Sequence, residues 1–155
     1  MKVKIKLLEG GKMPEKKHVD DAAFDCYARL SEDVVISPKT RTKIPLGFAL
    51  ELPKGWEAVI RPRSGLTLKG IDNGIGTIDA NYRGEVCAVV INNSNPPFVV
   101  CEDGMTYQEP FVVHNGDRIC QMVIKKLDEV ELIQADELSE TDRGSNGFGS
   151  TGVKG

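Results

Sequence analysis

Short apolar runs separated by glycine and proline turns dominate this sequence and restrict what the chain can fold into. The chain holds 16 glycines and 8 prolines in 155 residues, and no long amphipathic helical pattern lies between them. Short strands at regular spacing with Gly/Pro turns are typical of an all-β sandwich or barrel. We therefore expect an all-β, jelly-roll-like distorted barrel or sandwich, with one short helix near residues 64–69.

The predicted strands follow from apolar–polar alternation and from short runs of β-branched residues. They are residues 1–8, 34–37, 41–52, 56–63, 86–92, 98–101, 110–113, 118–125 and 129–134. The sequence PFVV occurs at 97–100 and again at 110–113. Because proline confines a strand to an edge or a strand start, we expect a small extra hairpin near residues 95–109.

Composition narrows the class of protein. A formal net charge of −3 and a pI near 5.5 argue against direct nucleic-acid binding, which requires a basic face. No apolar run approaches the roughly 20 residues of a membrane span, and MKVKIKLLEG lacks the apolar core of a signal peptide. We expect one domain, without a membrane partner and located in the cytoplasm.

The cysteines and histidines show no metal or triad pattern. The four cysteines are Cys26, Cys87, Cys101 and Cys120. No C-x-x-C pair occurs, so buried free thiols are favoured over disulfides or zinc ligands. His18 and His114 have no motif context, which disfavours a Ser-His-Asp triad.

The segment 73–87, NGIGTIDANYRGEVC, has the pattern of a β-hairpin. Asp79 ends an apolar run, Tyr82 follows three residues later, and neighbouring glycines let backbone amides approach a ligand. This arrangement predicts a pocket for a small polar molecule, with a carboxylate placed to act on it. A surface hairpin with a hydrogen-bonded aspartate is the alternative for this segment alone.

The segment 61–70, RPRSGLTLKG, ends a strand and opens a helical turn. With Ser64 as N-cap, the N–H groups of Gly65 and Leu66 are expected to be free to bind an anion. Arg63 adds a bidentate donor suited to phosphate. An ordinary capped turn with a solvated arginine is the alternative.

Two further segments contain polar groups that suit a phosphate. In GDRICQM, 116–122, Asp117 and Arg118 are predicted to form a structural ion pair, whereas Gln121 can bind both a phosphate oxygen and a water. The Gly/Ser-rich arm 142–155 follows the β-domain 1–141 and contains G-x-G-x-x-G without the helix of a dinucleotide fold. Arg143 can neutralise an anion and Phe148 can stack on a base. An unstructured chain end is the alternative.

In this order the segments resemble the five motifs of the trimeric dUTP pyrophosphatases (dUTPases). They read AAFDCYA, RPRSGLTLKG, NGIGTIDANYRGE, GDRICQM and RGSNGFGSTG, and they span residues 22–152. The resemblance implies a homotrimer with active sites shared between subunits and Mg²⁺-dependent hydrolysis of dUTP to dUMP and pyrophosphate. In the family this reaction keeps uracil out of DNA and supplies dUMP for dTMP synthesis.

The resemblance also implies roles for individual residues. Asp79 would activate the water that attacks the α-phosphorus, and Tyr82 would pack beneath the deoxyribose and exclude a 2′-hydroxyl. The uracil would be held by Asn73, Thr77, Ile78 and Cys87 and capped by Phe148 from a neighbouring subunit. The phosphates would be held by Arg63, Ser64, Gly65 and Gln121 and, from a neighbouring subunit, by Arg143, Gly149, Ser150 and Thr151. Asp25 and Gln121 would reach the metal through its waters.

Two features depart from the family pattern. The first motif has Ala23-Phe24 and Cys26 where the family usually has Gly and Leu, and the segment 95–109 has no counterpart in compact members. We expect this insert to alter an edge or to contact another protein. A dCTP deaminase-type relative and a dUTP-gated regulatory protein of the same fold remain open as alternatives.

Overall fold

Strands make up nearly all of the regular structure in the computed structural model, which describes residues 1–94, 99–100, 106–107 and 110–146. These residues form thirteen strands and one helix of a single turn, which confirms the predicted all-β class. The strands are β1 (Lys4–Leu7), β2 (Phe24–Tyr27), β3 (Val34–Ile36), β4 (Arg41–Pro45), β5 (Phe48–Glu51), β6 (Trp56–Arg61), β7 (Ile71–Asn73), β8 (Gly76–Ile78), β9 (Cys87–Asn92), β10 (Val99–Val100), β11 (Thr106–Tyr107), β12 (Phe111–Val113) and β13 (Arg118–Lys126). The helix α1 (Ser64–Thr67) lies between β6 and β7.

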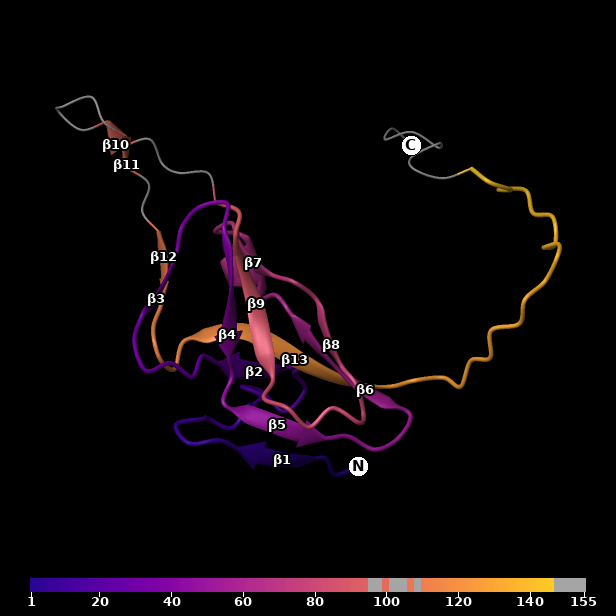
Figure 1. Cartoon of the computed structure of the whole chain (residues 1–155), viewed down its shortest axis with the longest axis horizontal. Coiled ribbons are helices and arrows are strands. Elements are labelled where there is room, and N and C mark those ends of the chain that lie inside the picture. Colours follow the sequence, from indigo (N-terminus) through magenta and orange to yellow (C-terminus); the bar gives the residue numbers. More distant parts are fainter. Residues whose placement is uncertain (95–98, 101–105, 108–109, 147–155) are drawn as a thin grey trace.

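Two larger sheets form the body, and every strand pair is antiparallel. One sheet has the order β2-β13-β6-β8 and the other the order β4-β9-β7. Smaller ladders join β1 to β5, β3 to β12 and β10 to β11. In Figure 1 the β1–β5 ladder lies at one end of the body and the β10–β11 ladder projects from the other. Because strands far apart in sequence pair, the connections are those of a jelly-roll-like fold.

Side-chain alternation explains how β9 lies in its sheet. Val90 and Asn92 are buried, whereas Val89 on the opposite face is 42% exposed, as the two-residue period of a strand requires. The buried amide of Asn92 is fully used: its Nδ2 donates to the Ile36 carbonyl at 2.8 Å, and its Oδ1 accepts from the Ser94 N–H at 3.0 Å. One face of β9 therefore packs into the core and the other remains available to line a site.

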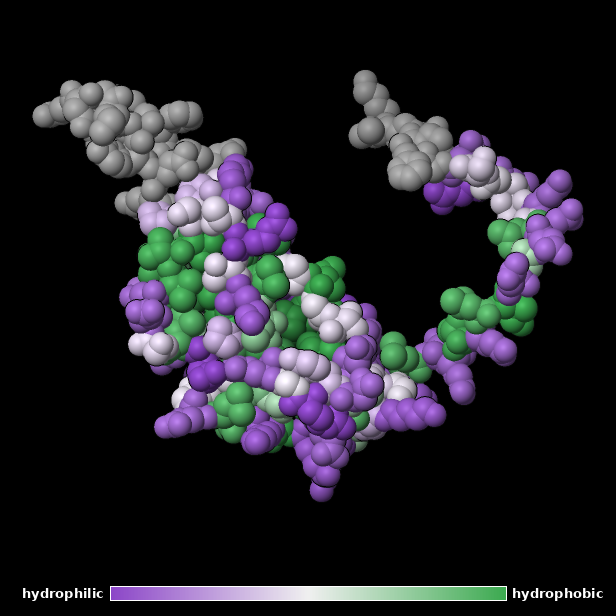
Figure 2. Space-filling view, in the orientation of Figure 1, coloured by the Kyte–Doolittle hydropathy of each residue, from purple (hydrophilic) through white to green (hydrophobic). Residues whose placement is uncertain are grey.

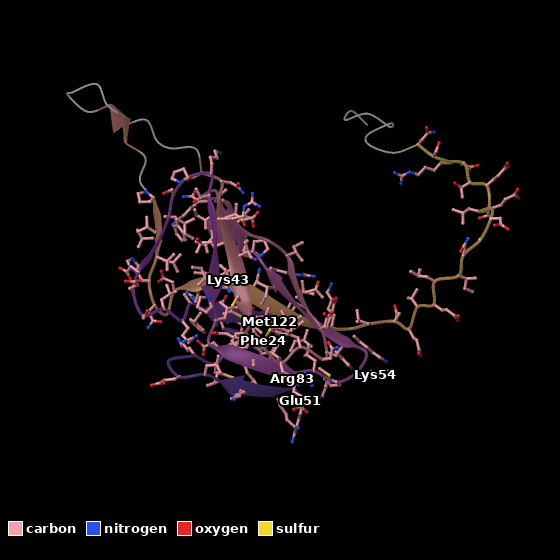
Figure 3. The ribbon with its side chains drawn as sticks, in the orientation of Figure 1. Phe24, Lys43, Glu51, Lys54, Arg83 and Met122 are labelled. Atoms are coloured by element: carbon pink, nitrogen blue, oxygen red, sulfur yellow. The ribbon has the colours of Figure 1, made fainter. Side chains whose placement is uncertain are left out.

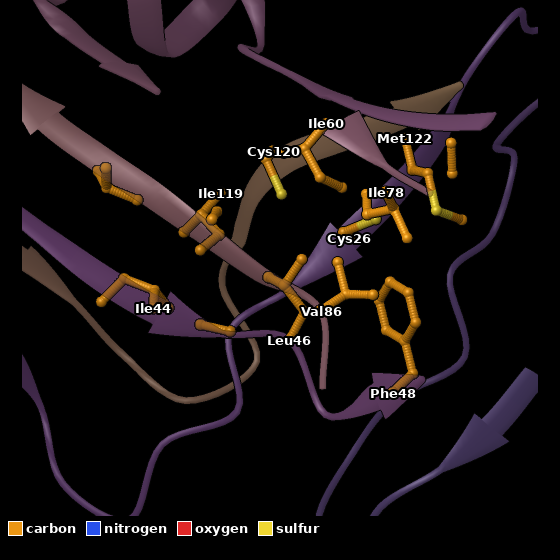
Figure 4. Close-up of a cluster of buried hydrophobic side chains, with 14 of the residues drawn as sticks. Cys26, Ile44, Leu46, Phe48, Ile60, Ile78, Val86, Ile119, Cys120 and Met122 are labelled. Carbon is orange, nitrogen blue, oxygen red and sulfur yellow. The ribbon is translucent and has the colours of Figure 1, made fainter. Parts of the chain in front are cut away.

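The core fills the space between the two sheets (Figure 4). Its largest fully buried apolar side chains are Phe48, Ile36, Ile44, Leu46, Ile60, Val86, Val90 and Val113. Cys26 and Cys120 lie opposite each other in the β2–β13 ladder and are buried, free thiols. Interaction with the neighbouring Cys120 thiol, together with burial, raises the pKa of Cys26 far above its ordinary value. The prediction of buried free thiols is therefore confirmed for this pair. Cys87 is free and half-buried, and Cys101 lies outside the described residues.

The prediction of one long strand over 41–52 is wrong, because the chain turns sharply between β4 and β5. Gly47 has a φ of +73°, a conformation that side chains disfavour and glycine tolerates. A Cβ there would lie 2.5 Å from the Gly11 Cα and 2.8 Å from the Arg29 Cδ. Glycine at position 47 therefore lets the chain leave the three-stranded sheet and pair with β1.

The prediction of a hairpin over 73–87 also needs correction. β8 pairs with β6 in the four-stranded sheet, whereas β9 pairs with β4 and β7 in the other sheet. The loop 79–86 consequently crosses from one sheet to the other instead of closing a two-stranded hairpin. This crossing leaves the ends of β8 and β9 apart, with room for a cavity between them.

The predicted strand at 129–134 is not formed in this chain. Beyond β13 the chain runs away from the body as far as residue 146 without pairing (Figure 1). Val130, Leu132 and Ile133 are 74%, 94% and 79% exposed, and Figure 2 shows apolar residues along this otherwise hydrophilic segment. An apolar pattern typical of a strand thus finds no neighbour within the described part of the chain. Among the described residues, no helix is long and apolar enough to cross a membrane.

The insert leaves the body at a tightly packed point. Asn93 donates its N–H to the Gly70 carbonyl at 2.7 Å, and a Cβ on Gly70 would lie 2.8 Å from the Ser94 Cα. Beyond this point β10 pairs with β11, Val99 opposite Tyr107 and Val100 opposite Thr106. The remaining residues of 95–109 lie outside the described part of the chain.

Candidate active site

A cavity of about 470 Å³ opens where β8 and β9 diverge. Its lining comprises Lys43, Ile60, Gly76, Thr77, Ile78, Asp79, Tyr82, Glu85, Val86 and Cys87. Five of these residues, Thr77, Ile78, Asp79, Tyr82 and Cys87, were predicted from the sequence as site residues. The volume lies within the range of small-molecule sites, so this cavity is the candidate site for a nucleoside-sized ligand.

The loop that follows β8 places Asp79 and Tyr82 on the cavity wall. Ile78 is buried and ends the strand, so the exposed Asp79 comes directly after a fixed point. The Tyr82 N–H donates to the Asp79 carbonyl at 3.0 Å, and the Tyr82 hydroxyl donates to the Glu85 carbonyl at 3.0 Å. Arg83 closes the loop by donating to the Ala80 carbonyl at 2.7 Å. Asp79 and Tyr82 therefore line the cavity from a loop that these hydrogen bonds hold in place.

Asn73, which is also a predicted site residue, lies on β7 with Val90 of β9 opposite it. It is 5% exposed, and its Nδ2 donates to the Gly74 carbonyl at 3.2 Å. Its Oδ1 is buried and has no hydrogen-bond partner among the described residues. An unpaired buried acceptor costs about 1–3 kcal/mol, which a ligand N–H would remove. Asn73 does not line the cavity itself.

A second cluster forms around Asp25, on β2. Arg63 Nε lies 3.1 Å from one carboxylate oxygen of Asp25, and Arg118 Nη1 lies 3.0 Å from the other. Gln121 faces Asp25 across the β2–β13 ladder and donates its Nε2 to the Pro62 carbonyl at 2.7 Å. Asp25, Gln121, Arg63 and Ser64, all predicted as phosphate or metal residues, thus lie on or directly after three adjacent strands of the four-stranded sheet, β2, β13 and β6.

The predicted ion pair between Asp117 and Arg118 is wrong. Arg118 pairs with Asp25, as described above, and the Asp117 carboxylate instead accepts the N–H of His114 at 2.8 Å. Asp117 closes the tight turn 114–117, in which its own N–H returns to the His114 carbonyl. The turn orients its side chain locally, so Arg118 is available to a carboxylate from another strand.

The role of Ser64 as N-cap is also wrong. The N-cap is Arg63, with extended backbone angles and no side-chain capping bond, and Ser64 is the first residue of α1. The Leu66 N–H bonds to the Arg63 carbonyl at 2.9 Å, so it is not free for an anion. Ser64 and Gly65 are exposed and contribute no cap. The hydroxyl of Ser64 is therefore not used in capping the helix.

The two clusters do not share a cavity within one chain. None of Asp25, Arg63, Ser64, Gly65 and Gln121 belongs to the described lining of the cavity. Arg143 lies on the exposed segment after β13, where its Nε donates to the Asn146 carbonyl at 3.0 Å. Phe148, Gly149, Ser150 and Thr151 lie outside the described residues. A single chain therefore presents the cavity residues and the Asp25 cluster at separate places.

Three charged residues near the cavity were missed by sequence reasoning. Lys43, which Figure 3 labels on β4, belongs to the cavity lining. Glu85 also lines it and binds Arg29 in a bidentate ion pair, with contacts of 2.9 and 2.8 Å. The Arg29 contact holds the pKa of Glu85 below its ordinary value. The sequence offered only two weak signals for the ion pair: the acidic Glu85 shortly before β9, and Arg29 between two apolar residues.

No ready-made metal cage is present among the described residues, which contain no group of three or more His, Cys, Asp or Glu side chains. A magnesium ion that binds a triphosphate is coordinated mainly by phosphate oxygens and water, with one or two carboxylates. Asp25 and Gln121, as neighbouring oxygen donors, fit that requirement.

The fold and cavity define a class: an all-β protein with a nucleoside-sized cavity lined by an aspartate and a tyrosine, and a separate cluster of arginines around Asp25. The family model for dUTPase matches residues 9–104 and 105–152. The chain belongs to the dUTPase family.

Related proteins agree with this assignment. The deoxyuridine 5′-triphosphate nucleotidohydrolase of Treponema denticola is 44% identical over 99% of each chain. A dUTPase structure from Staphylococcus bacteriophage 80alpha, solved with dUpNHpp, is 30% identical to this chain. Its TM-score is 0.80, and the match covers 98% of this chain and 99% of that one. That dUTPase is described as controlling transfer of virulence genes by a proto-oncogenic G protein-like mechanism. A mutant dUTPase of S. aureus phage phi11, described as coordinating a structural Mg(II) ion, is 28% identical with a TM-score of 0.75 over 88% and 98%.

Proposed function

We propose that this chain hydrolyses dUTP to dUMP and pyrophosphate, with Asp79 activating the attacking water. The observation that carries the proposal is the cavity itself, whose wall unites Asp79 and Tyr82 with Thr77, Ile78 and Cys87. Membership of the dUTPase family and the 44% identity to a deoxyuridine triphosphate nucleotidohydrolase support it.

In this reaction one water is consumed and one P–O bond is broken. Asp79 accepts a proton from the water while the water oxygen bonds to the α-phosphorus. The bond from the α-phosphorus to the bridging oxygen breaks, and pyrophosphate leaves with the electron pair. A positioned general base contributes roughly 10²–10⁴-fold to such a step.

Arg63, Ser64, Gly65 and Gln121 are proposed to hold the phosphates. Arg63 supplies charge, and the unused Ser64 hydroxyl supplies a donor near the leaving oxygen. A Mg²⁺ ion bound to the phosphates would neutralise charge there, held through water by Asp25 and Gln121. The Mg(II) ion described for the phi11 relative supports this cofactor.

Uracil recognition is assigned to Asn73 and to the backbone of 77–79 and Cys87. The unpaired Oδ1 of Asn73 supports this assignment, because uracil offers an N–H donor where cytosine offers an acceptor. Tyr82 is proposed to pack beneath the deoxyribose and to leave no space for a 2′-hydroxyl. The dUpNHpp bound to the bacteriophage 80alpha relative is a dUTP analogue, which supports this substrate.

The active sites are proposed to be shared between subunits of a homotrimer. The separation of the two clusters in one chain supports this arrangement, because the Arg63 cluster of one subunit can face the cavity of another. The arm 142–155 would complete the site, with Arg143 on the γ-phosphate, Phe148 over the uracil, and Gly149, Ser150 and Thr151 around the triphosphate. A cytoplasmic location stays a prediction from the sequence.

The test is a pyrophosphate-release assay with dUTP, dCTP, UTP and the four common dNTPs, with Mg²⁺ and with EDTA. Turnover of dUTP alone, lost in EDTA, is the expected result. Ammonia release from dCTP would instead identify a deaminase-type relative. Equal turnover of UTP would contradict the role given to Tyr82.

A second, regulatory function is proposed for the insert 95–109, since the bacteriophage 80alpha relative is described as controlling gene transfer. The insert would contact a partner protein while the cavity binds dUTP. Deleting residues 97–110 should leave turnover intact and abolish partner binding. If trimer, kinetics and partner binding are all unchanged by the deletion, the insert has no such role.

A further inference from the structure

Arg29 forms a two-point ion pair with Glu85, which lines the cavity. Arg29 Nε lies 2.9 Å from Glu85 Oε1, and Arg29 Nη2 lies 2.8 Å from Glu85 Oε2. Their side chains are only 33% and 23% exposed, so solvent screens the pair less than a surface ion pair. Bidentate geometry of this kind fixes orientation as well as distance.

The same carboxylate also reaches the β4–β5 corner. The Gly47 N–H donates to Glu85 Oε1 at 2.9 Å. Glu85 therefore ties three parts of the chain together: the loop 79–86, the segment after β2 that carries Arg29, and the Gly47 turn. The space beside Gly47 is filled by the Arg29 side chain, whose Cδ would lie 2.8 Å from a Cβ at position 47.

The backbone next to Glu85 is fixed at the same place. The Val86 N–H donates to the Phe48 carbonyl at 2.8 Å, and the Leu46 N–H donates to the Val86 carbonyl at 3.0 Å. The Glu85 carbonyl accepts the Tyr82 hydroxyl at 3.0 Å. The Tyr82 hydroxyl is thus bonded to Glu85. Arg29 holds the side chain of Glu85, and the next residue, Val86, is hydrogen-bonded to β5.

We propose that Arg29 and Glu85 are positioning residues that hold the Tyr82 ring against the nucleoside and thereby set the discrimination between deoxyribonucleotide and ribonucleotide. The inference rests on the proposed function, since it concerns the sugar-binding wall of that same cavity. Neither residue touches the reacting atoms. Both act through the Glu85 carbonyl and the Tyr82 hydroxyl.

The position of the Tyr82 ring must be held closely because the two substrates differ very little in size. UTP and dUTP differ by one hydroxyl oxygen, so a ring that shifts by a fraction of an oxygen diameter no longer excludes the larger sugar. Tyr82 is 45% exposed, so core packing does not hold it. Its position depends on the loop bonds listed above and on the clamp that fixes Glu85.

The test compares variants by the ratio of kcat/KM for dUTP to kcat/KM for UTP, at a temperature where each variant is folded. Arg29→Ala should lower this ratio by about tenfold or more, mainly because kcat/KM for UTP rises, while kcat for dUTP stays close to that of the unmodified protein. Arg29→Lys retains the positive charge without the two-point contact, so its ratio should lie between those of Arg29→Ala and the unmodified protein. The matched control is Lys4→Ala, which removes the exposed 2.9 Å ion pair between Lys4 and Glu51 on the β1–β5 ladder and should leave the ratio unchanged.

A double-variant comparison separates positioning from general destabilisation. Tyr82→Phe removes the hydroxyl through which the clamp acts, so adding Arg29→Ala to Tyr82→Phe should change the ratio much less than Arg29→Ala does alone. Independent, multiplying effects would overturn the inference, as would an unchanged ratio in Arg29→Ala. If the unmodified protein turns over no dUTP, the proposed function fails; if it is selective and the variants are equally selective, only this inference fails.

Discussion

Asp25 and Gln121 lie directly opposite each other on β2 and β13, and Arg61 on β6 lies opposite Gln121 on its other side. Three sequence-distant segments therefore meet in one row across the four-stranded sheet. Arg61 is the last residue of β6, and Arg63 and Ser64 follow it after Pro62. Pairing register, and not sequence proximity, assembles the phosphate side of the proposed site.

Replacing Asp79 by Asn should abolish most turnover and leave nucleotide binding intact. The amide keeps the shape of the side chain but cannot accept the proton of water, so kcat should fall by roughly 10²–10⁴-fold. Single-turnover kinetics and calorimetric binding of a non-hydrolysable dUTP analogue measure the two quantities. Asp20→Asn, at an exposed loop position, is the charge-matched control. Full activity in Asp79→Asn would remove this residue from the mechanism.

Mixing two inactive variants should restore activity if sites are shared. Asp79→Asn and Arg63→Ala, unfolded together and refolded at equal amounts, should regain about a quarter of the unmodified activity through random assembly. In Arg63→Ala the carboxylate of Asp25 keeps its ion pair with Arg118, so it is not left without a partner. Asp79→Asn mixed with Tyr82→Ala is the control and should regain nothing, because both groups line one cavity of one chain. No recovery in the first mixture would argue for sites built within single subunits.

Asn73→Ala should impair substrate binding more than folding. Its Oδ1 has no partner among the described residues, so in the ligand-free protein removal of the amide loses only the 3.2 Å hydrogen bond from Nδ2 to the Gly74 carbonyl. A uracil N–H left unpaired in a buried site costs about 1–3 kcal/mol, which raises KM for dUTP by about tenfold. Steady-state kinetics and thermal unfolding measure the two effects. The exposed Asn93, changed to Ala, is the control; equal KM values in both variants would contradict the assignment.

Gly47→Ala should destabilise the fold far more than Gly55→Ala. Both glycines have positive φ, +73° and +77°, which costs an L-residue roughly 1–2 kcal/mol. A Cβ at position 55 meets nothing within 4 Å, whereas at position 47 it meets the Gly11 Cα at 2.5 Å. We expect a loss of about 2–5 kcal/mol for Gly47→Ala and only the backbone cost for Gly55→Ala. Urea unfolding at equal protein concentration measures both, and similar midpoints would show that the contact is relieved easily.

The His114–Asp33 pair should make stability depend on pH. Hydrogen bonding of His114 Nδ1 to Asp33 at 2.9 Å raises the pKa of His114 above its ordinary value, and Asp117 adds to the shift. A raised folded-state pKa gives stability that is complete below the unfolded-state value of about 6.5 and is lost as pH rises through the folded-state value.

Asp33→Asn should therefore lower the melting temperature near pH 5.5 and make no difference near pH 9. Both side chains are more than half exposed, so the effect should be small and should shrink in high salt. Thermal unfolding across that pH range, with Asp20→Asn as control, measures it. A difference that grows with pH would have the wrong sign for this pair.

The sequence predicted the class of fold and the identity of the cavity residues better than it predicted the pairing of strands. Thr77, Asp79 and Tyr82 lie close together in the chain, so local pattern is sufficient to group them. The partners of β8 and β9 are decided by packing between two sheets, which alternation does not specify. Both a hairpin and a crossing place Ile78 inside and Asp79 outside.

Non-local ion pairs were beyond sequence reasoning. Arg118 stands next to Asp117 in the chain, yet the turn from His114 uses the Asp117 carboxylate, and Arg118 binds Asp25 instead. Arg29 and Glu85 meet only because Gly47 allows the β4–β5 corner to approach β2. The apolar segment 129–134 has the composition of a strand, but no described strand lies beside it to pair with. Local residue types report what a segment can do, and tertiary neighbours decide which option is realised.

If Arg63 holds a phosphate as proposed, its contact with Asp25 would make phosphate binding an exchange of anions. Arg63 holds a carboxylate at 3.1 Å, so a phosphate gains only the difference between two charge-assisted contacts. Asp25 retains Arg118 during the exchange and is not left uncompensated. Ligands of high charge density displace a carboxylate most readily, so a triphosphate would have the advantage over a monophosphate product. Asp25 would then assist the departure of that product by pairing with the guanidinium again.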